Sequence, residues 1–289
     1  MVTLDLHALR IFLAVARHGH FTQAAHEVFL TQPAVSMQMK QLETQLGTPL
    51  FKKVGRVLRL TDAGQALRER AIRVLAEARG ATEAVAAAVG MKRGRLDVGA
   101  STTPGIYVLP AVIATFRRRH PGITVTLTID NSSVVAEKVA SGELDLGFVG
   151  WELTSFDVVR DRFCEDELVV IGPRGMKKLR PEAMARERFI QRESGSATRS
   201  LTEAWFRKNN LPCQPAMELN SPEAVKRAVA AGLGISVISR LAIGWELKLK
   251  QLSVVPVEGF PIRRPLYRIT HKGCEPGPVE QEFIRLARC

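Results

Sequence analysis

Hydrogen-bonding side chains recur on one side of a predicted helix between residues 32 and 40, and no carboxylate stands among them. Gln32, Ser36 and Lys40 offer an amide, a hydroxyl and an ammonium group, with Pro33 and Met37 beside them. An ordinary solvated helix face would carry Glu and Lys pairs at i,i+4 spacing. Groups of this kind near the start of a helix are suited to contacting the edges of nucleic-acid bases.

The helix that must position these groups is well marked. Thr31 is a good N-cap, because its hydroxyl can accept a hydrogen bond from an unpaired N–H of the first turn. Pro33 falls in that first turn, where its missing N–H costs nothing. Behind the polar face, Val35, Met39 and Leu42 recur with the spacing of one apolar helix face, which predicts packing against other helices.

Two further helices are predicted upstream, at residues 6–18 and from 21 or 22 to 28. Leu9, Phe12 and Leu13 give the first an apolar side, and the small Ala24 and Ala25 let another helix approach the second closely. Three short helices with a tight turn before the last fit a helix-turn-helix unit, whose last helix enters the major groove of DNA. The alternative is a small helical subdomain that binds nothing.

Residues 49–61, PLFKKVGRVLRLT, predict a small β-hairpin, or wing, directly after these helices. Short apolar-alternating stretches flank a central Gly55, and Lys52, Lys53, Arg56 and Arg59 bring positive charge without a carboxylate. A solvated basic loop is the alternative. A wing beside a groove-reading helix would place these charges on phosphates, which position a protein on DNA.

Residues 6–64 resemble the N-terminal domain of LysR-type transcriptional regulators almost without gaps. The TQPAVS core, the QLE that follows it, the PLF and the LTDAG are marks of that family, and together they are highly specific. The resemblance implies a winged helix-turn-helix that binds double-stranded DNA operators of dyad symmetry. The residues that we expect to contact DNA are Thr22, Gln23, Thr31, Gln32, Pro33, Ser36, Met37, Lys40, Lys52, Lys53 and Arg56.

The composition agrees with a polyanionic partner at this end of the chain. The sequence has 289 residues and a formal net charge of +12, which is long enough for two or three domains, and more than half of the excess charge lies in its first third. Asp5, His7 and Arg10 interrupt what would otherwise be a signal peptide, and no apolar run reaches the length of a membrane span. We therefore expect a soluble, cytoplasmic protein.

The cysteines and histidines predict neither a metal site nor a cofactor. Cys164, Cys213, Cys274 and Cys289 show no C-x-x-C pairing, and the histidines near the helical unit lack ligand spacing. A redox-sensing pair stays an alternative, because one branch of the resembled family senses oxidants with cysteines. A free Cys is more often a small buried hydrophobe.

A long helix at residues 62–89 follows the wing, with apolar residues at alternating spacings of four and three. This is a heptad seam, which predicts that the helix pairs with a second copy of the chain in a homodimer or homotetramer. The residues expected at this contact are Leu67, Ala71, Val74, Ala78, Ala81 and Val85. The alternative is a helix packed on its own C-terminal domain. Residues 90–94, GMKRG, are predicted to form a hinge.

From residue 95 onward, short apolar strands alternate with helices. Strands are expected at 95–100, 123–129, 144–149, 167–172, 188–193, 217–220 and 235–240, and helices at about 105–119, 132–141, 197–209, 222–231 and 277–287. This alternation implies a parallel sheet. A second set of elements and a return of the chain to the first set predict two lobes with a cleft between them.

The expected fold is therefore an α+β multidomain chain. It comprises a winged helix-turn-helix at residues 1–61, the linker helix at 62–89, the hinge at 90–94 and an effector-binding domain at 95–289. The last domain would have one lobe at about 95–163 with 266–289 and another at about 164–265, like periplasmic binding proteins. The family resemblance implies the same arrangement.

Three hydroxyl-rich loops precede helices at the expected carboxyl ends of the strands, at residues 100–104, 193–199 and 220–222. Free N–H groups at helix starts bind anions. A single hydroxyl more often just caps its helix, but three such loops around one cleft favour a small anionic effector. The expected effector residues are Ser101, Thr102, Thr103, Ser196, Thr198, Arg199 and Ser221. The resembled family places contacts at positions matching Ser101, Thr103 and Thr198, whereas Pro104 stands where some members have a polar side chain.

Three stretches resemble the regulators of carbon-fixation (RuBisCO) operons within this family: QRESGSATR, MELNSPEAVKRAVAAGLGISVISR and VEGFPIRRPLYRITHKG. A sulfur-metabolism branch shares much of them. The expected effector is thus a phosphorylated sugar acid, a nucleotide cofactor or a small oxyanion, and RNA polymerase is a further expected partner. An enzyme is disfavoured, because GxSxG, HExxH, a phosphate-loop lysine and paired carboxylates are all missing. The basic helical domain argues against a solute-binding module for transport.

Overall fold

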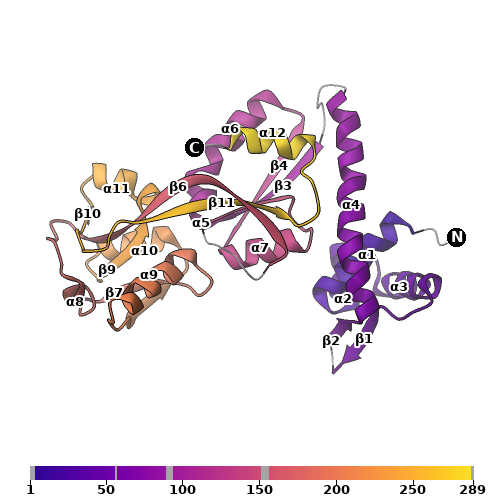
Figure 1. Cartoon of the computed structure of the whole chain (residues 1–289), viewed down its shortest axis with the longest axis horizontal. Helices are drawn as coiled ribbons and strands as arrows, with labels where there is room; N and C mark the ends of the chain where they lie inside the picture. The colour runs from indigo at the N-terminus through magenta and orange to yellow at the C-terminus, as the bar shows by residue number, and fades with distance from the viewer. Residues whose placement is uncertain (1–3, 56, 89–93, 151–155, 288–289) are drawn as a thin grey trace. The chain divides into compact units, whose positions relative to one another are not determined.

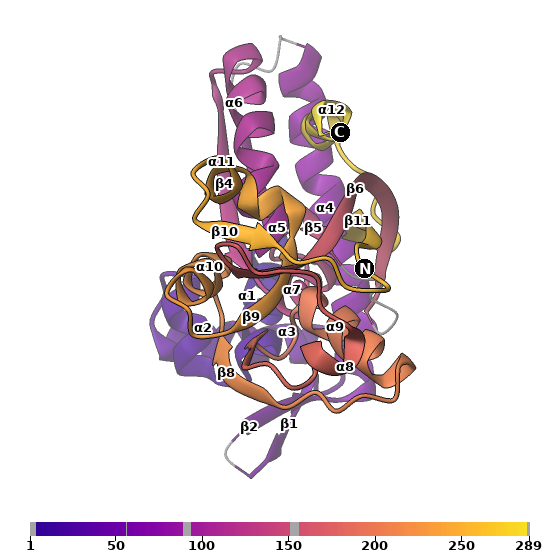
Figure 2. The same cartoon turned by 90° about the vertical axis from the view of Figure 1, so that its left-hand side faces the viewer.

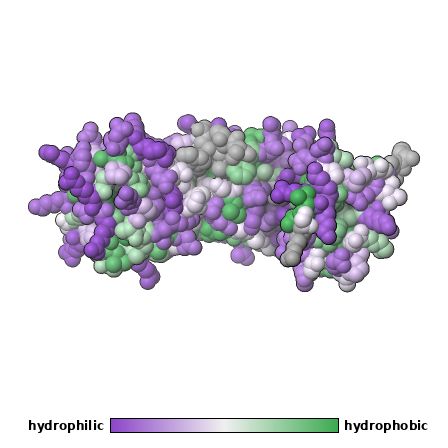
Figure 3. Space-filling view, turned by 90° about the horizontal axis from the view of Figure 1, so that it is seen from below, coloured by the Kyte–Doolittle hydropathy of each residue, from purple (hydrophilic) through white to green (hydrophobic). Residues whose placement is uncertain are grey.

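The computed structural model describes residues 4–55, 57–88, 94–150 and 156–287. The chain divides into two compact units, residues 1–90 with 273–278 and residues 91–272 with 279–289. Their elements are drawn from two directions in Figures 1 and 2. Within the described ranges, no helix is both long and apolar enough to cross a membrane. On the face seen in Figure 3, hydrophilic residues predominate and the apolar areas are small.

The first unit contains three short helices, a hairpin and a long helix. They are α1 (Leu6–His18), α2 (Phe21–Glu27), α3 (Gln32–Leu46), β1 (Phe51–Val54), β2 (Val57–Leu60) and α4 (Asp62–Ala88). Phe12, Val35 and Met39 are at most 1% exposed in the core on which these helices converge. The three helices and the wing therefore lie where the sequence predicts them, and the apolar spacing of each helix is the reason.

The long helix α4 uses part of its predicted seam for its own unit. Ala71 is 1% exposed, and Leu67 packs against the same core as α1. The expectation that Ala71 lies at a dimer contact is therefore wrong, because the first turns of α4 must cover the N-terminal helices. Val74 is 43% exposed and Val85 is 69% exposed, so the later part of the seam is open to a second copy.

The second unit is built on a mixed sheet with the strand order β4-β3-β5-β11-β6-β9-β7-β8, and β10 pairs with β6. The strands are β3 (Gly94–Ser101), β4 (Ile123–Asp130), β5 (Leu146–Val149), β6 (Val158–Pro173), β7 (Phe189–Arg192), β8 (Pro215–Leu219), β9 (Ile235–Ser239), β10 (Leu252–Val254) and β11 (Ile262–His271). Strand β3 is parallel to β4 and β5, and β7 is parallel to β8 and β9. The expected parallel sheet is corrected by β6, β10 and β11, which all pair antiparallel.

Two lobes share this sheet. Lobe I has β3, β4 and β5 with α5 (Thr102–Tyr107), α6 (Leu109–Arg119), α7 (Ser132–Ala140) and α12 (Pro278–Leu286). Lobe II has β7 to β10 with α8 (Pro181–Met184), α9 (Ala197–Lys208), α10 (Pro222–Ala230), the 3-10 helix η1 (Arg240–Ile243) and α11 (Gly244–Lys248). The long strands β6 and β11 run from one lobe into the other, as Figure 1 shows.

Each lobe has its own apolar core. In lobe I, Phe116 and Phe148 both contact Phe283 of α12, at ring distances of 5.3 and 6.1 Å, so the last helix completes the first lobe. In lobe II, Trp205 and Phe206 of α9 are buried against the sheet. The single helix expected at about 105–119 is two helices, because Pro110 has no N–H to continue the ladder of α5.

Candidate functional site

Helix α3 packs into the core of its unit through Val35, Met39 and Leu42, so its opposite face points to solvent. Thr31 caps α3 by accepting from the Ala34 N–H at 3.4 Å, and Pro33 lies in the first turn. Glu43 near the end of α3 accepts from the N–H groups of Leu50 and Phe51, at 2.7 and 3.2 Å. This carboxylate fastens α3 to the wing, so the two predicted contact elements are held together.

Most of the residues predicted to contact DNA lie on the surface of the first unit. Those exposed are Thr22, Gln23, Thr31, Gln32, Pro33, Met37, Lys40, Lys52 and Lys53, and Ser36 is half buried. Arg56 lies outside the described residues. Within the described part of the chain, Lys40, Lys52 and Lys53 form no ion pair, so their charges are available to a polyanion. The arrangement can therefore present base-contacting groups on α3 and phosphate-contacting groups on β1.

Phe29, in the turn between α2 and α3, was not singled out by its sequence. It has a positive φ of 56°, unusual for a bulky residue, and its side chain is 95% exposed. This exposed apolar ring, two residues before the N-cap of α3, adds an apolar surface near the start of that helix. A run of Phe29-Leu30 before the cap carries no local signal for this conformation.

A second candidate site lies between the lobes, where β3, β4 and β7 end. Its lining residues are Ser101, Thr102, Thr103, Asn131, Ser132, Glu193, Ser196, Ala197, Thr198 and Arg264. Carboxyl ends of parallel strands are the usual place for ligands in α/β sheets. The free space among these side chains is about 10 Å³, room for about one water molecule, so the lobes or the lining side chains must rearrange before a metabolite can enter.

Two features of this cleft point to an anion. Ser196 is the N-cap residue of α9, yet its side chain makes no capping hydrogen bond, so the first N–H groups of α9 are left for another acceptor. Ser132, at the start of α7 in the opposite lobe, is 2% exposed, and its hydroxyl has no partner within the described residues. A buried polar group without a partner is rare in proteins, and an anion between α7 and α9 would supply one.

A buried arginine from the shared strand β11 joins the two sides of the cleft. Arg264 donates from Nε and Nη2 to one oxygen of Asp166, at 2.9 and 2.8 Å. It also donates from Nη2 to the Thr103 hydroxyl at 3.3 Å and from Nη1 to the Thr198 hydroxyl at 3.4 Å. Burial lowers the pKa of Arg264 from its ordinary value, and the carboxylate of Asp166 opposes that shift. One charged group thus contacts both lobes at once.

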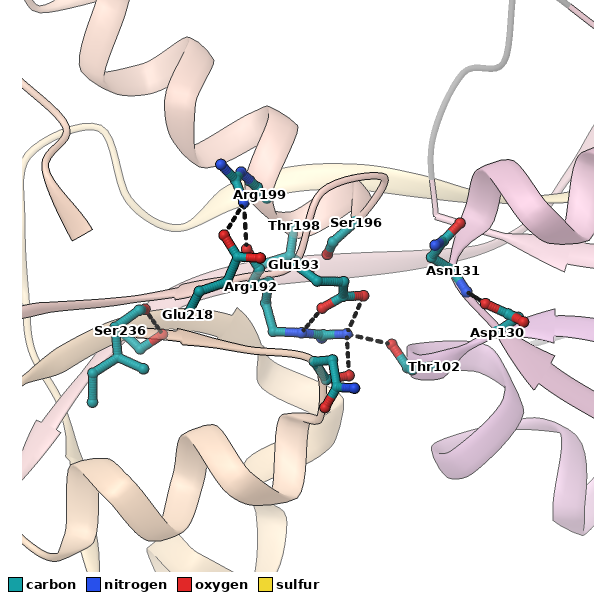
Figure 4. Close-up of polar contacts among 12 residues, drawn as sticks. Thr102, Asp130, Asn131, Arg192, Glu193, Ser196, Thr198, Arg199, Glu218 and Ser236 are labelled. Carbon is teal, nitrogen blue, oxygen red and sulfur yellow. Dashed lines mark hydrogen bonds and ion pairs between the residues drawn. The ribbon is translucent and has the colours of Figure 1, made fainter. Parts of the chain in front are cut away.

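A second arginine lies at the edge of the same cleft. Arg192, at the end of β7, forms a two-pronged pair with Glu193, at 2.8 and 3.0 Å. It also donates to the hydroxyl of Thr102 across the lobes at 3.3 Å and to the carbonyl of Asn220 at 3.4 Å, as Figure 4 shows for Thr102. The two oxygens of the lining carboxylate Glu193 are therefore already used by Arg192.

The structure brings together most, though not all, of the expected effector residues. Ser101, Thr102, Thr103, Ser196 and Thr198 line the cleft.

The other two expected residues do not line this cleft. Arg199 instead pairs with Glu203 and Glu218, at 2.8 and 2.6 Å, and the contact with Glu218 is drawn in Figure 4. Ser221 is the N-cap residue of α10 and is not among the lining residues, although the carbonyl of the preceding Asn220 accepts from Arg192. Charge on Arg199 is thus already balanced by two carboxylates.

The sequence reasoning missed five polar groups of the cleft. They are Asn131, Ser132, Arg192, Glu193 and Arg264. Asn131 and Ser132 carry the same signal as the predicted loops, since they follow a strand and open a helix. Nothing in the run of residues 261–265, PIRRP, shows that Arg264 rather than Arg263 turns inward.

The described residues include no metal site, and the Cys213 thiol is not a reactive one. Within the described ranges, no cluster of His, Cys, Asp and Glu could hold a metal ion. Burial raises the pKa of the Cys213 thiol, which lowers its reactivity. Cys164 takes part in a disulfide bond.

Comparisons with known protein families match both units. Residues 6–65 match the bacterial regulatory helix-turn-helix proteins of the lysR family, and residues 90–289 match the LysR substrate binding domain. The chain belongs to the LysR family of transcription regulators. It is therefore a DNA-binding regulator with an effector-binding domain and not an enzyme, as its sequence predicts.

Similar proteins carry the resemblance to carbon-fixation regulators over almost the full length. The chain is 39% identical to the HTH-type transcriptional activator CmpR of Synechocystis sp., over 98% of this chain and 95% of that protein. It is 35% identical to the RuBisCO operon transcriptional regulator of Allochromatium vinosum, over 97% and 94% of the two chains. Among solved structures, the regulatory domain of Synechocystis CcmR in complex with 2-PG has 30% identity and a TM-score of 0.64, covering 68% of this chain and 96% of that one.

Proposed function

We propose that this LysR-type regulator controls genes of inorganic carbon assimilation, and that a small phosphorylated acid bound between the lobes of its second unit is the signal. The observation that carries the proposal is that two sets of hydrogen-bond donors without an acceptor meet in the cleft. The uncapped start of α9 and the buried hydroxyl of Ser132 face one space from opposite lobes. The similar CcmR domain was solved with 2-PG, and similar full-length proteins regulate RuBisCO operons.

An anion in this cleft would act by changing the balance between two lobe arrangements. A ligand shifts such a balance only by the difference in its affinity for the two states. Donors on both lobes are satisfied together only when the lobes are close, so the ligand favours closure. The effector residues of this proposal are Ser101, Thr102, Thr103, Ser132 and Thr198, with the backbone at the start of α9.

In the DNA-binding part of the proposal, α3 contacts bases and the wing contacts phosphates. Gln32, Ser36 and Lys40 contact base edges in the major groove, because they occupy the outward face near the start of α3. Lys52 and Lys53 contact phosphates from β1. A dyad operator needs two copies of this unit, and the exposed later part of the α4 seam supplies the contact between copies. With chromosomal DNA as its partner, we expect the protein in the cytoplasm.

The test is a titration of the full chain on the DNA upstream of its own gene and of neighbouring carbon-assimilation genes. Each titration is run alone and with 2-phosphoglycolate, 2-phosphoglycerate, 3-phosphoglycerate, inorganic phosphate or glycolate. A phosphorylated acid should change the affinity or the footprint, and glycolate, which lacks the phosphate, should not. If glycolate and the phosphorylated acids act alike, or if none of them acts, the proposed effector class is wrong.

A further inference from the structure

Four threonine and serine hydroxyls of the cleft share one property: within the described residues, none of them donates to a protein acceptor. Thr102 accepts from Arg192, Thr103 and Thr198 accept from Arg264, and Ser132 has no partner at all. A hydroxyl has one proton to donate and two lone pairs to accept with. Each of these groups therefore keeps its proton for something else in the cleft.

The guanidinium of Arg264 decides which way two of these protons point. Its contacts of 3.3 and 3.4 Å to the threonine oxygens are long for hydrogen bonds. A positive charge at that distance nevertheless turns the negative end of an O–H dipole toward itself and the proton away, and the effect is strong because the group is buried. The proton of Thr103 in lobe I and that of Thr198 in lobe II are thus directed away from β11.

Asp166 keeps the guanidinium in this orientation. One of its oxygens accepts from Nε and Nη2 of Arg264, and the other accepts from the Ser239 hydroxyl at 2.7 Å and the Glu167 N–H at 2.8 Å. Arg264 and Asp166 are both below 5% exposed, so the pair is fixed on both sides. The described contacts use four of the five N–H groups of Arg264.

The carboxylate and the amide oxygen that line the cleft are already engaged. Glu193 is the only carboxylate among the described lining residues, and Arg192 donates to both of its oxygens. The side-chain oxygen of Asn131 accepts from the Val134 N–H at 3.0 Å. A ligand in this space therefore meets mainly donors, namely hydroxyl protons and the N–H groups of α9, and only hydroxyl lone pairs remain to accept a proton of its own.

We propose that Arg264 is a positioning residue that sets the polarity of the cleft, so that the site binds the dianion of a phosphate monoester in preference to its protonated monoanion. This inference rests on the proposed function. A monoanionic phosphate has one charged oxygen fewer to accept from these donors, and its P–O–H group finds only hydroxyl lone pairs as acceptors. The second pKa of a phosphate monoester is about 6, so selectivity for the dianion appears as pH-dependent binding in an accessible range.

Two arginine–carboxylate pairs supply the charged groups that the described residues bring to the cleft. Arg264 comes from β11, Asp166 from β6, and Arg192 and Glu193 from the end of β7. No histidine is among the described lining residues. The proton that governs binding between pH 5 and pH 8 is therefore that of the ligand.

The experiment measures binding of 2-phosphoglycolate to the full chain by calorimetry between pH 5 and pH 8 at constant ionic strength. In the unmodified protein, affinity should be flat above pH 7 and fall about tenfold per pH unit well below the second phosphate pKa of about 6. Inorganic sulfate, which stays dianionic over this range, serves as competitor, and its inhibition constant should not change with pH. An equal slope for sulfate would place the proton on the protein and overturn the inference.

Two variants remove the effect of Arg264 on the threonine hydroxyls and are chosen so that the protein still folds. Arg264→Lys keeps a positive charge beside Asp166, but one ammonium cannot contact both threonines. Arg264→Met with Asp166→Asn removes the buried pair together, which avoids an unpaired buried charge. Affinity at pH 7.5 should fall about tenfold in each. Their threonine hydroxyls are then free to rotate and accept, so the slope below pH 6 should become clearly shallower.

The matched control is Arg199→Lys, the same exchange at a helix position outside the lining residues, and it should keep both the affinity and the slope. A variant that loses the same factor at every pH would show that Arg264 is merely structural, and the inference would be wrong. If the unmodified chain binds none of the phosphorylated acids, the proposed function fails first. If it binds them and the variants keep the slope, only the role of Arg264 fails.

Discussion

Gly195 sets how closely the two lobes approach, so adding a methyl group there should push them apart. The residue has a φ of +82°, and a Cβ built on it would lie 3.2 Å from the side-chain amide of Asn131 in the opposite lobe. This distance is shorter than ordinary van der Waals contact. Gly195→Ala therefore requires that Asn131 or a whole lobe gives way.

Two costs of this substitution can be estimated separately. The left-handed backbone costs an alanine about 1–2 kcal/mol relative to glycine, and it does so whether the lobes are open or closed. This cost lowers the free energy of unfolding. The contact with Asn131 exists only when the lobes are close, and overpacking of this kind costs about 1–3 kcal/mol. We expect effector affinity to fall by roughly five- to hundredfold.

Asn131→Ser separates the two costs. Serine caps a helix about as well as asparagine, so α7 keeps its start, while the shorter side chain leaves room for the methyl group. In the double variant, affinity for 2-phosphoglycolate should return to that of Asn131→Ser alone, and the lost unfolding free energy should not return. Calorimetry and urea unfolding measure the two quantities. Strictly additive losses of affinity would refute a direct contact between these residues.

Four other variants test the remaining surfaces. Gln32→Ala should cost about 1–3 kcal/mol on the cognate operator and leave the affinity for random DNA unchanged in anisotropy titrations; equal losses on both would exclude base contact. Lys53→Ala should weaken both alike and reduce the slope of log K against log salt by about 0.9. Val74→Asp should give monomers in sedimentation equilibrium while the second unit melts as before, and an intact dimer would place the contact elsewhere. Hydrogen bonds from Arg285 lower the pKa of Glu282 to about 2, so its contribution to stability is present above its unfolded pKa of about 4.3 and is lost as pH falls toward 2; Glu282→Gln should make acid unfolding shallower over that interval.

The N-terminal domain could be predicted almost completely because its signals are local. Thr31, Pro33 and the apolar positions of α3 each report on residues within four places of themselves, and a hairpin needs only its own turn. The seam of α4 was harder, since one heptad pattern fits both a partner helix and the helices of the same unit. Ala71 belongs to the second of these, and only the packing of α1 decides it.

The effector cleft was predicted in outline and missed in its charges. Loops that follow strands and open helices can be found by pattern, which is how Thr103 and Thr198 were identified. The inward turn of Arg264 depends on the register of β11 against β6, whose paired residues are about a hundred places apart in the chain. The orientation of the Arg199 side chain likewise depends on its ion pair with Glu218 of β8. Long-range pairings of this kind leave no trace in local spacing.

The narrowness of the cleft has a consequence for the speed of the response. With about 10 Å³ free between the lobes, metabolite can be captured only after the contacts of Arg264 and Arg192 across the lobes have been broken. Stopped-flow traces should therefore rise with metabolite concentration and then level off at the rate of opening. Lobe motions of this type take microseconds to milliseconds, far less than the time needed to transcribe a gene. The regulator would then follow the momentary concentration of its metabolite, and a brief pulse would leave no memory in the protein.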